Sequence, residues 1–337
     1  MTVLLLASER SLLALREGSP WTVDVHLEGL APRCLAVDRA HAQAYCGTQQ
    51  HGLWRSDNGG RSWQAVPGVR DDWDITAVAA GAAGSGQVDG AVYVGTEPSA
   101  IFRSVDAGQT WSESVGLGRL RSAATWSFPP RPETHHVRWI EPDASVPDRV
   151  FVAIEAGALV RTLDGGRTWE DRTEGGPYDT HTAATHPLAR DRLYSAAGDG
   201  YFESLDAGET WRRRVEGLRH RYLVGIAVDP RDPETVVVSA AAGPFVAYRP
   251  AGAETFVYRS TRGRAWTLSS EGLPPPGGTT VSRFAVDADG GIIYAANNRG
   301  VYRSLDAGAK WGALDVAWES GPPSSGVLAA ALLREPG

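Results

Sequence analysis

Lysine is almost absent from this chain. Among its 33 basic residues only Lys310 is a lysine, and the others are arginines. Schiff-base and lysine-nucleophile mechanisms need a lysine amine, so this composition nearly excludes them. The net charge of −7 argues against a nucleic-acid partner, because binding to phosphates requires a basic stripe.

Cysteines and long apolar runs are also scarce. The two cysteines, Cys34 and Cys46, are too few for a disulfide framework. A hairpin centred near Ala40 would place them opposite one another, and we interpret them as free thiols in neighbouring strands. No apolar run reaches the roughly 20 residues that span a bilayer, which predicts no membrane partner. The start, MTVLLLAS, lacks the basic region and cleavage site of a signal peptide, so we expect a strand there and a cytoplasmic protein.

One short pattern recurs along the sequence. The copy SLDAGETW covers residues 204–211, and related copies cover 56–63, 104–111, 162–169 and 304–311. A shortened copy, STRGRAW at 260–266, lacks the aspartate. The tryptophans that end the copies are 42 to 58 residues apart, a period typical of propellers and solenoids.

Four short strands are expected around each copy. An apolar strand such as RVFVAIE precedes it, a strand such as GYFES runs into it, and a polar strand such as WRRRVEG follows. A further apolar strand, clearest in YLVGIAVDP, lies upstream. Four strands separated by turn residues predict one antiparallel propeller blade.

The two chain ends complete the pattern, because residues 2–28 supply three strands and residues 326–334 supply one. Together they would form a blade that closes the ring and leaves no open sheet edge. The sequence therefore predicts an all-β protein: a seven-bladed β-propeller of four-stranded antiparallel blades, with one blade shared between the N- and C-termini. We expect a single domain over 1–337, with the other blades at about 30–68, 74–116, 136–174, 180–217, 221–272 and 279–316.

The Ser-x-Asp-x-Gly-x-Thr-Trp copies resemble the Asp-box, also called the bacterial neuraminidase repeat, and the resemblance covers nearly the whole chain. Asp-box propellers include sialidases and other glycoside hydrolases, sortilin-type receptor domains and photosystem II assembly factors. The resemblance therefore implies a fold and leaves the activity open. The Arg-Ile-Pro motif of sialidases is absent, which disfavours sialidase activity proper.

The repeated aspartates are interpreted as structural. An aspartate at the third position can accept hydrogen bonds from backbone N–H groups of a tight turn. One such residue per blade cannot converge on a single substrate. This applies to Asp106, Asp164, Asp206 and Asp306.

Two insertions predict functional loops on the face opposite the repeated turns. They cover Gly116–His136 and Ser239–Phe256, and both exceed ordinary connection lengths. They carry Trp126, Tyr248 and Arg249, which are suited to covering a polar ligand.

Acid–base candidates come from two adjacent blades. When the first strands are aligned on AVDP at 227–230, His136 and His181 occupy the same position. Tyr178 and Asp179 lie close to His181 in the sequence. We therefore expect catalytic roles for His136, His181, Tyr178 and Asp179.

The same two blades offer carboxylates for a divalent metal, because Glu155 and Asp199 fall in their turns between the second and third strands. A metal would be held by His136, His181, Glu155 and Asp199. A purely structural role for the histidines stays open, because no HxH or HExxH spacing occurs.

Arginines and aromatic residues beside the inner strands are the candidates for binding a ligand. They are Arg33, Arg138, Arg221, Tyr222, Trp126, Arg283 and Tyr248.

Two functions follow from these residues. The first is binding and processing of a sugar or other small polar molecule at the channel mouth, by histidine and carboxylate chemistry with or without a metal. Such an enzyme would be of the glycosidase or lyase type. The alternative is a non-catalytic scaffold that uses the same face to bind a protein or a glycan.

Overall fold

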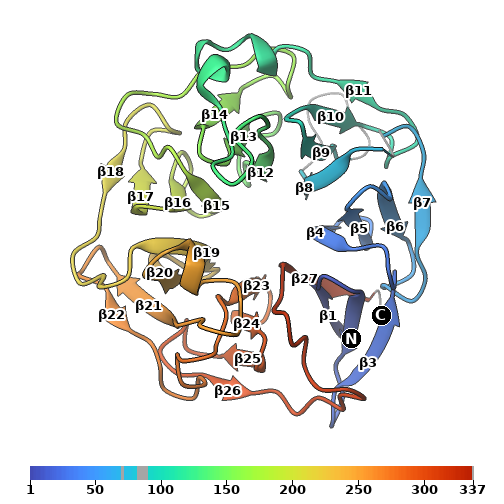
Figure 1. Cartoon of the computed structure of the whole chain (residues 1–337), viewed down its shortest axis with the longest axis vertical. Helices are drawn as coiled ribbons and strands as arrows, with labels where there is room; N and C mark the ends of the chain where they lie inside the picture. The colour runs from blue at the N-terminus through green and yellow to red at the C-terminus, as the bar shows by residue number, and fades with distance from the viewer. Residues whose placement is uncertain (70–71, 82–89, 336–337) are drawn as a thin grey trace.

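Seven small antiparallel sheets form a closed ring in this computed structural model, which describes residues 1–69, 72–81 and 90–335 (Figure 1). Six sheets have four strands. The sheet β12–β13–β14 has three, and an isolated bridge between Arg161 and Glu170 stands beside its third strand. The predicted seven-bladed β-propeller is thereby confirmed.

Each sheet runs outward from a first strand that faces the centre of the ring. The first strands are β27 (Ala329–Arg334), β4 (Pro32–Asp38), β8 (Asp74–Ala80), β12 (Val137–Pro142), β15 (Thr180–Thr185), β19 (Tyr222–Asp229) and β23 (Arg283–Asp287). The second strands are β1 (Thr2–Ala7), β5 (Gln43–Thr48), β9 (Val92–Glu97), β13 (Val150–Ile154), β16 (Leu193–Ala197), β20 (Asp232–Ala241) and β24 (Ile292–Asn297).

The outer half of each sheet follows the same order. The third strands are β2 (Leu12–Arg16), β6 (Leu53–Ser56), β10 (Ile101–Ser104), β14 (Ala158–Thr162), β17 (Gly200–Ser204), β21 (Thr255–Thr261) and β25 (Gly300–Ser304). The fourth strands are β3 (Thr22–His26), β7 (Gln64–Val66), β11 (Ser112–Glu113), β18 (Arg212–Arg213), β22 (Thr267–Leu268) and β26 (Gly312–Ala313). Three short 3₁₀ helices, η1 (Leu117–Arg119), η2 (Arg121–Thr125) and η3 (Pro244–Val246), lie in the two insertions. Among the described residues no helix is long and apolar enough to cross a membrane.

The hydrophobic core lies between neighbouring blades. Every residue of β1, β13 and β16 is buried, because a second strand is covered by another sheet on both faces. One apolar cluster joins Ile101 of β10 to Val137 of β12, and others bridge further pairs of blades. The fourth strands β11, β18, β22 and β26 are exposed and only two residues long, so they offer little edge for pairing with another chain.

The ring is closed by strands from the two ends of the chain. β27 pairs with β1 in antiparallel register, from Thr2 opposite Arg334 to Ala7 opposite Ala329. Beyond the last pair, Arg16 Nη1 lies 2.9 Å from a carboxylate oxygen of Glu335. The terminal segments therefore share one sheet.

The repeat turns, which we define as residues 56–63, 104–111, 162–169, 204–211 and 304–311, are held by side-chain hydrogen bonds. In the turn 204–211 the Ser204 hydroxyl donates to Asp206 (2.7 Å) and accepts from the Gly208 N–H (2.8 Å). Asp206 also accepts from the N–H (2.8 Å) and hydroxyl (2.6 Å) of Thr210. The aspartate thus satisfies donors that the tight turn leaves without a strand partner.

The same bonds recur around the ring, with Asp106, Asp164 and Asp306 each accepting from the backbone N–H four residues later. Gly208 has a φ of +92°, a conformation that glycine adopts without strain. Ala207, just before it, has a φ of +58°, which the sequence did not indicate. The repeat turns all lie on one face of the ring, which we call the turn face.

The two cysteines are free and buried. Their expected pairing opposite one another is wrong, because Cys34 lies opposite Gly47 and Cys46 lies opposite Leu35. The shift of one residue places the two thiols on opposite faces of the sheet.

We expect Leu333→Ala to lower the free energy of unfolding by about 2–5 kcal/mol, since Leu333 is fully buried in the closing sheet. Val25→Ala, on the exposed strand β3, is the control and should cost less than about 1 kcal/mol. Urea unfolding of both variants measures the difference. Equal losses would contradict the importance of the closing strand.

Asp206→Ala should cost about 1–3 kcal/mol at pH 7, because it removes the acceptor of three hydrogen bonds. Burial favours a higher pKa for Asp206, but its bonds with Thr210 and Ser204 outweigh burial and hold the pKa below the ordinary value. Because the pKa of Asp206 is lowered in the folded state, the ionised carboxylate stabilises the fold above about pH 4. This stabilisation is lost as the pH falls through the folded-state pKa. The difference between wild type and variant should therefore shrink at pH 3, whereas Leu205→Ala, at an exposed site in the same turn, should change little at either pH.

Candidate functional site

Two adjoining cavities occupy the channel inside the ring. The polar chamber has a volume of about 410 Å³ and lies toward the face opposite the repeat turns. The apolar chamber has a volume of about 570 Å³ and lies toward the turn face. Both are lined by Arg33, Thr76, Arg138, Arg283 and Leu328. The polar chamber is further lined by Glu9, Glu97, Arg131, His136, Glu155 and Tyr248.

Bulges in the inner strands set which side chains face the channel. The register of five first strands shifts by one residue at equivalent points. A bulge adds a residue outside the regular alternation and re-aims its side chain. The bulge residues are Arg33, Thr76, Arg138, His181 and Val224.

This register corrects the alignment of the two histidines. The residue equivalent to His181 is Arg138, and His136 precedes β12 by one residue. The five strands carry the bulge at the same point, so it does not disturb the alignment. The alignment on AVDP instead matches Pro142 with Pro230, which displaces this strand by two residues. The two imidazoles therefore occupy different levels of the channel, with His136 lining the polar chamber and His181 lining the apolar one.

His136 lies between two carboxylates. Its Nε2 is 2.9 Å from an oxygen of Glu155, and its Nδ1 is 3.7 Å from an oxygen of Glu97. The same Glu97 oxygen accepts a hydrogen bond of 2.7 Å from Arg131. Phe128, from the first insertion, packs edge-on against the His136 ring at a centroid distance of 4.8 Å.

Glu155 is ionised. Its Oε2 also lies 3.2 Å from Nε of Arg138, whose side chain is surrounded by protein yet 23 % exposed to the cavity. Burial favours a higher pKa for Glu155, but Arg138 and the hydrogen bond from His136 outweigh burial and hold this pKa well below its usual range. The charge of Arg138 is thus balanced inside the channel.

His181 is held in one orientation. Its side chain is 0 % exposed, and its Nδ1 donates to the carbonyl of Leu223 at 2.5 Å. Burial lowers the pKa of His181, and the nearby Asp179 offsets this only in part. The neutral ring therefore directs a bare Nε2 lone pair at Asp179, whose Oδ2 is 3.5 Å away.

Three ligand atoms of the kind that bind metals converge here. One atom each from Glu155, Asp179 and His181 lies within 4.8 Å of the others. Glu155 and His181 were among the four metal ligands expected from the sequence, whereas Asp179 was not. Asp199 instead has 58 % of its side chain exposed and lies beside Arg213.

Arg283 is positively charged, and no carboxylate of the described residues lies within hydrogen-bond distance of it. Its Nε faces the carbonyl of Val327 at 3.4 Å. Burial, and after it the charge of Arg138, lowers the pKa of Arg283 to about 10. The guanidinium is therefore still charged at neutral pH. Arg33, on the other side of β27, donates to the Gln49 amide oxygen.

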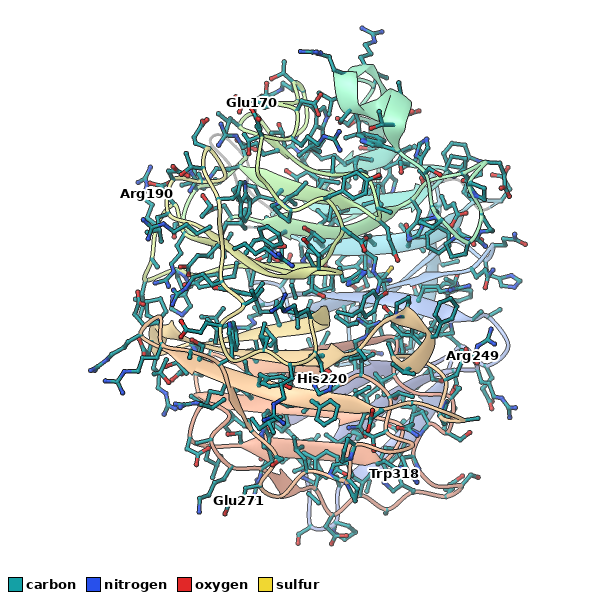
Figure 2. The ribbon with its side chains drawn as sticks, turned by 60° about the vertical axis from the view of Figure 1, so that its left-hand side comes forward. Glu170, Arg190, His220, Arg249, Glu271 and Trp318 are labelled. Carbon is teal, nitrogen blue, oxygen red and sulfur yellow. The ribbon has the colours of Figure 1, made fainter. Side chains whose placement is uncertain are left out.

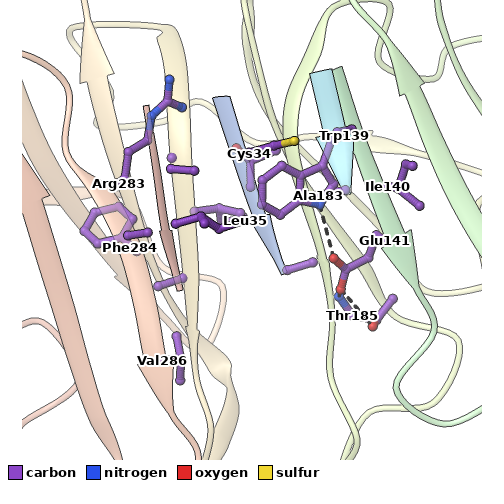
Figure 3. Close-up of a pocket in the computed structure, with 18 of the residues that line it drawn as sticks. Cys34, Leu35, Trp139, Ile140, Glu141, Ala183, Thr185, Arg283, Phe284 and Val286 are labelled. Carbon is purple, nitrogen blue, oxygen red and sulfur yellow. Dashed lines mark hydrogen bonds between the residues drawn. The ribbon is translucent and has the colours of Figure 1, made fainter. Parts of the chain in front are cut away.

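The apolar chamber is larger but has fewer titratable groups. Trp139 and Phe284 face it from opposite sides (Figure 3). Glu141 accepts hydrogen bonds from Thr185 and from the Trp139 indole. Convergent acids, bases and cations define a site better than volume does, so we take the polar chamber as the candidate site.

Several residues expected at the site lie elsewhere. Trp126 is 6 % exposed and packs in the core between two blades, so Phe128 takes the place expected of it. Tyr178 is 47 % exposed and stacks on Arg172. Arg221 is exposed and lines neither chamber.

The tyrosines of the second insertion and β19 lie together, with the hydroxyls of Tyr222 and Tyr248 3.0 Å apart. Tyr248 lines the polar chamber, and Tyr222 contacts the His181 ring at 4.8 Å. Arg249, the next residue, is exposed and projects from the edge opposite Arg190 of the turn face (Figure 2).

Glu97, like Glu9, Phe128 and Arg131 of the same chamber, was missed by the sequence reasoning. It follows β9 residue Thr96 just as Glu155 follows Ile154 of β13, so the two glutamates occupy equivalent positions in adjacent blades. Aligning the second strands VYVGTE and VFVAIE would have revealed the pair.

Known structures share the fold and little sequence. An ancestral GH74 enzyme superposes with a TM-score of 0.62 at 13 % identity, over 90 % of this chain and 38 % of its own. YCF48 bound to the D1 peptide gives 0.56 at 17 % identity, over 84 % and 81 %. A chain of the nidogen/laminin complex gives 0.52 at 12 % identity, over 99 % of each.

These similarities establish the class of the protein, a seven-bladed β-propeller, and they show the fold alone. This chain spans about 38 % of the length of the ancestral GH74 enzyme. The neighbours include an enzyme and a protein with a bound peptide. No protein-family model and no curated protein matches the sequence.

We expect the protonated Glu141 to stabilise the fold at about pH 5, and this contribution to be lost as the pH rises to about 8. Burial raises the pKa of Glu141 from 4.5 to about 7, although bonds from Thr185 and Trp139 oppose the shift. Between these values the folded state binds a proton that the unfolded state has lost, so raising the pH costs stability. Urea unfolding should therefore show that the free energy of unfolding of the wild type, relative to that of Glu141→Gln, decreases from about pH 5 to about pH 8. The exposed Glu113→Gln is the control, and an unchanged slope in the first variant would refute the assignment.

Proposed function

We propose that the protein binds a small anionic polar molecule of the acidic-sugar class in the polar chamber and acts on it by acid–base chemistry. The observation that carries this proposal is the unbalanced positive charge of Arg283 inside the channel. The Arg283 side chain is partly exposed to the channel, but it has less water around it than a surface cation. A bound anion would offset the cost of the hydration that it has lost.

The carboxylate of such a ligand would lie near Arg283 and Arg33. Both line the polar chamber, and the planar guanidinium group can bind a carboxylate through two parallel hydrogen bonds. Arg138 is less available, because Glu155 already balances it. The chamber volume of about 410 Å³ falls in the range of small-molecule sites.

Groups for proton transfer line the same chamber. His136 lies between Glu97 and Glu155, and Tyr248 also lines the chamber. A histidine held by carboxylates can donate or accept a proton during cleavage of a polar bond. The reaction that we propose is of the glycosidase or lyase type, because both reactions need a proton transferred to or from a polar bond.

Arg283→Gln should weaken the binding of N-acetylneuraminate or glucuronate at least about thirtyfold, because a charge-paired hydrogen bond in a buried site contributes about 2 kcal/mol or more. Isothermal titration calorimetry measures this change. The unfolding temperature of the ligand-free variant should not fall, since the substitution removes an unbalanced charge.

Arg221→Gln is the matched control, because Arg221 is exposed and lies outside both chambers. It should bind the acids like the wild type. His136→Gln separates binding from chemistry, and we expect it to abolish hydrolysis of an aryl glycoside of the bound acid while retaining affinity. Equal binding by wild type and Arg283→Gln, or no binding of either acid, would refute the proposal.

A non-catalytic scaffold is the second candidate, and it is favoured by Phe245 of η3. This side chain is 93 % exposed, and its loop carries Tyr248 of the polar chamber. An exposed aromatic residue is a common anchor for a protein partner. If peptides selected on the wild type lose binding in Phe245→Ala and keep it in Arg283→Gln, the scaffold function replaces the first proposal.

A further inference from the structure

We propose that Glu155, Asp179 and His181 form a binding site for one divalent first-row transition-metal ion between the two chambers. The three residues come from two segments: Glu155 from the turn between β13 and β14, and Asp179 and His181 from the start of β15 and the residue before it. One ligand atom of each lies within 4.8 Å of the other two. The site is distinct from the arginines proposed to bind an anion.

The bare nitrogen of His181 is the observation that points to a cation. Because Nδ1 donates to the Leu223 carbonyl, the neutral ring has its lone pair on Nε2. The side chain is fully buried, and Nε2 has no hydrogen-bond partner among the described residues. Metal-binding histidines are oriented in this way, with one nitrogen donating to a carbonyl and the other free for the ion.

Asp179 faces this nitrogen in a fixed orientation. Its Oδ1 accepts a hydrogen bond of 2.9 Å from the Ala156 N–H, which leaves Oδ2 3.5 Å from His181 Nε2. The space for this carboxylate exists because residue 198 is glycine, where a Cβ would lie 2.2 Å from Oδ2. A carboxylate oxygen and an imidazole lone pair repel one another unless a metal ion or a proton lies between them.

The local charge also suits a divalent ion. Glu155 and Asp179 contribute two negative charges, and Arg138 contributes one positive charge. Glu155 makes its contacts with His136 and Arg138 through Oε2, so Oε1 can point to the metal. A divalent ion would leave the cluster with one net positive charge, and the side chains of Asp179 and Glu155 are 28 % and 14 % exposed, so the ion can reach them.

The donor set selects the kind of ion. One imidazole nitrogen and two carboxylates suit Zn²⁺, Co²⁺ or Mn²⁺, whereas Ca²⁺ and Mg²⁺ prefer oxygen ligands alone. Among these, Zn²⁺ is expected to bind most tightly. Three protein ligands leave a further coordination position for water or a ligand, which is typical of catalytic rather than structural zinc sites.

The test is titration of the metal-free, full-length chain with Zn²⁺ and Co²⁺, using calorimetry and the visible absorption of bound Co²⁺. We expect one ion per chain. Asp179→Asn and His181→Gln should each weaken binding at least tenfold, and two variants guard against one failing to fold. Asp199→Asn is the matched control, because this neighbouring aspartate lies outside the cluster, and it should bind like the wild type.

Absence of stoichiometric binding by the wild type, or equal affinity in Asp179→Asn, would overturn the proposal. The bridge between His181 and Asp179 would then be a second ring proton, which the ¹⁵N shifts of the imidazole would reveal. Arg283→Gln should retain the metal while losing the acidic ligand, so this inference and the proposed function can fail separately.

Discussion

The pairing of β27 with β1 is the constraint on which the channel depends. Each first strand contacts the first strands of the two adjacent blades, so the cavities are enclosed because the last sheet closes the circle. The closing strand also lies between β23 and β4, which carry Arg283 and Arg33. The hydrogen bonds that join the chain ends thereby bring together two cations that are 250 residues apart in the sequence.

Within the closed ring, bulges decide the chemistry of each level of the channel. The equivalent bulge residues differ from blade to blade, and the charged or titratable ones include Arg138 and His181 in adjacent blades. Their neighbours Glu155 and Asp179 come from different loops. The turn that contains Gly198 contributes no acid to the cluster, and its glycine leaves room for the Asp179 carboxylate. A repeated scaffold can therefore hold an asymmetric site.

Two features of the site are costly to the fold. Arg283 is a cation without an anionic partner, and His181 directs a bare nitrogen at a carboxylate. Asp206 in its repeat turn shows the contrasting case, because its carboxylate has hydrogen-bond partners. Polar groups without a partner are expected at binding sites, because a group that already has its hydrogen bonds and counter-charge is not free to bind a ligand.

The sequence alone determined the seven blades, the shared sheet and the repeat turns, because strand alternation and turn residues act over a few neighbouring positions. It also brought His181, Glu155 and Asp179 into consideration. Only the tertiary structure decided that Arg138 and not His136 matches His181, that Trp126 is buried in the core, and that Glu97 joins the site. The physical reason is that the place of a residue in the channel depends on how its strand pairs with the next one and on what its loop packs against. A displacement of two residues along β12 and the burial of Trp126 are therefore visible only when those partners are present.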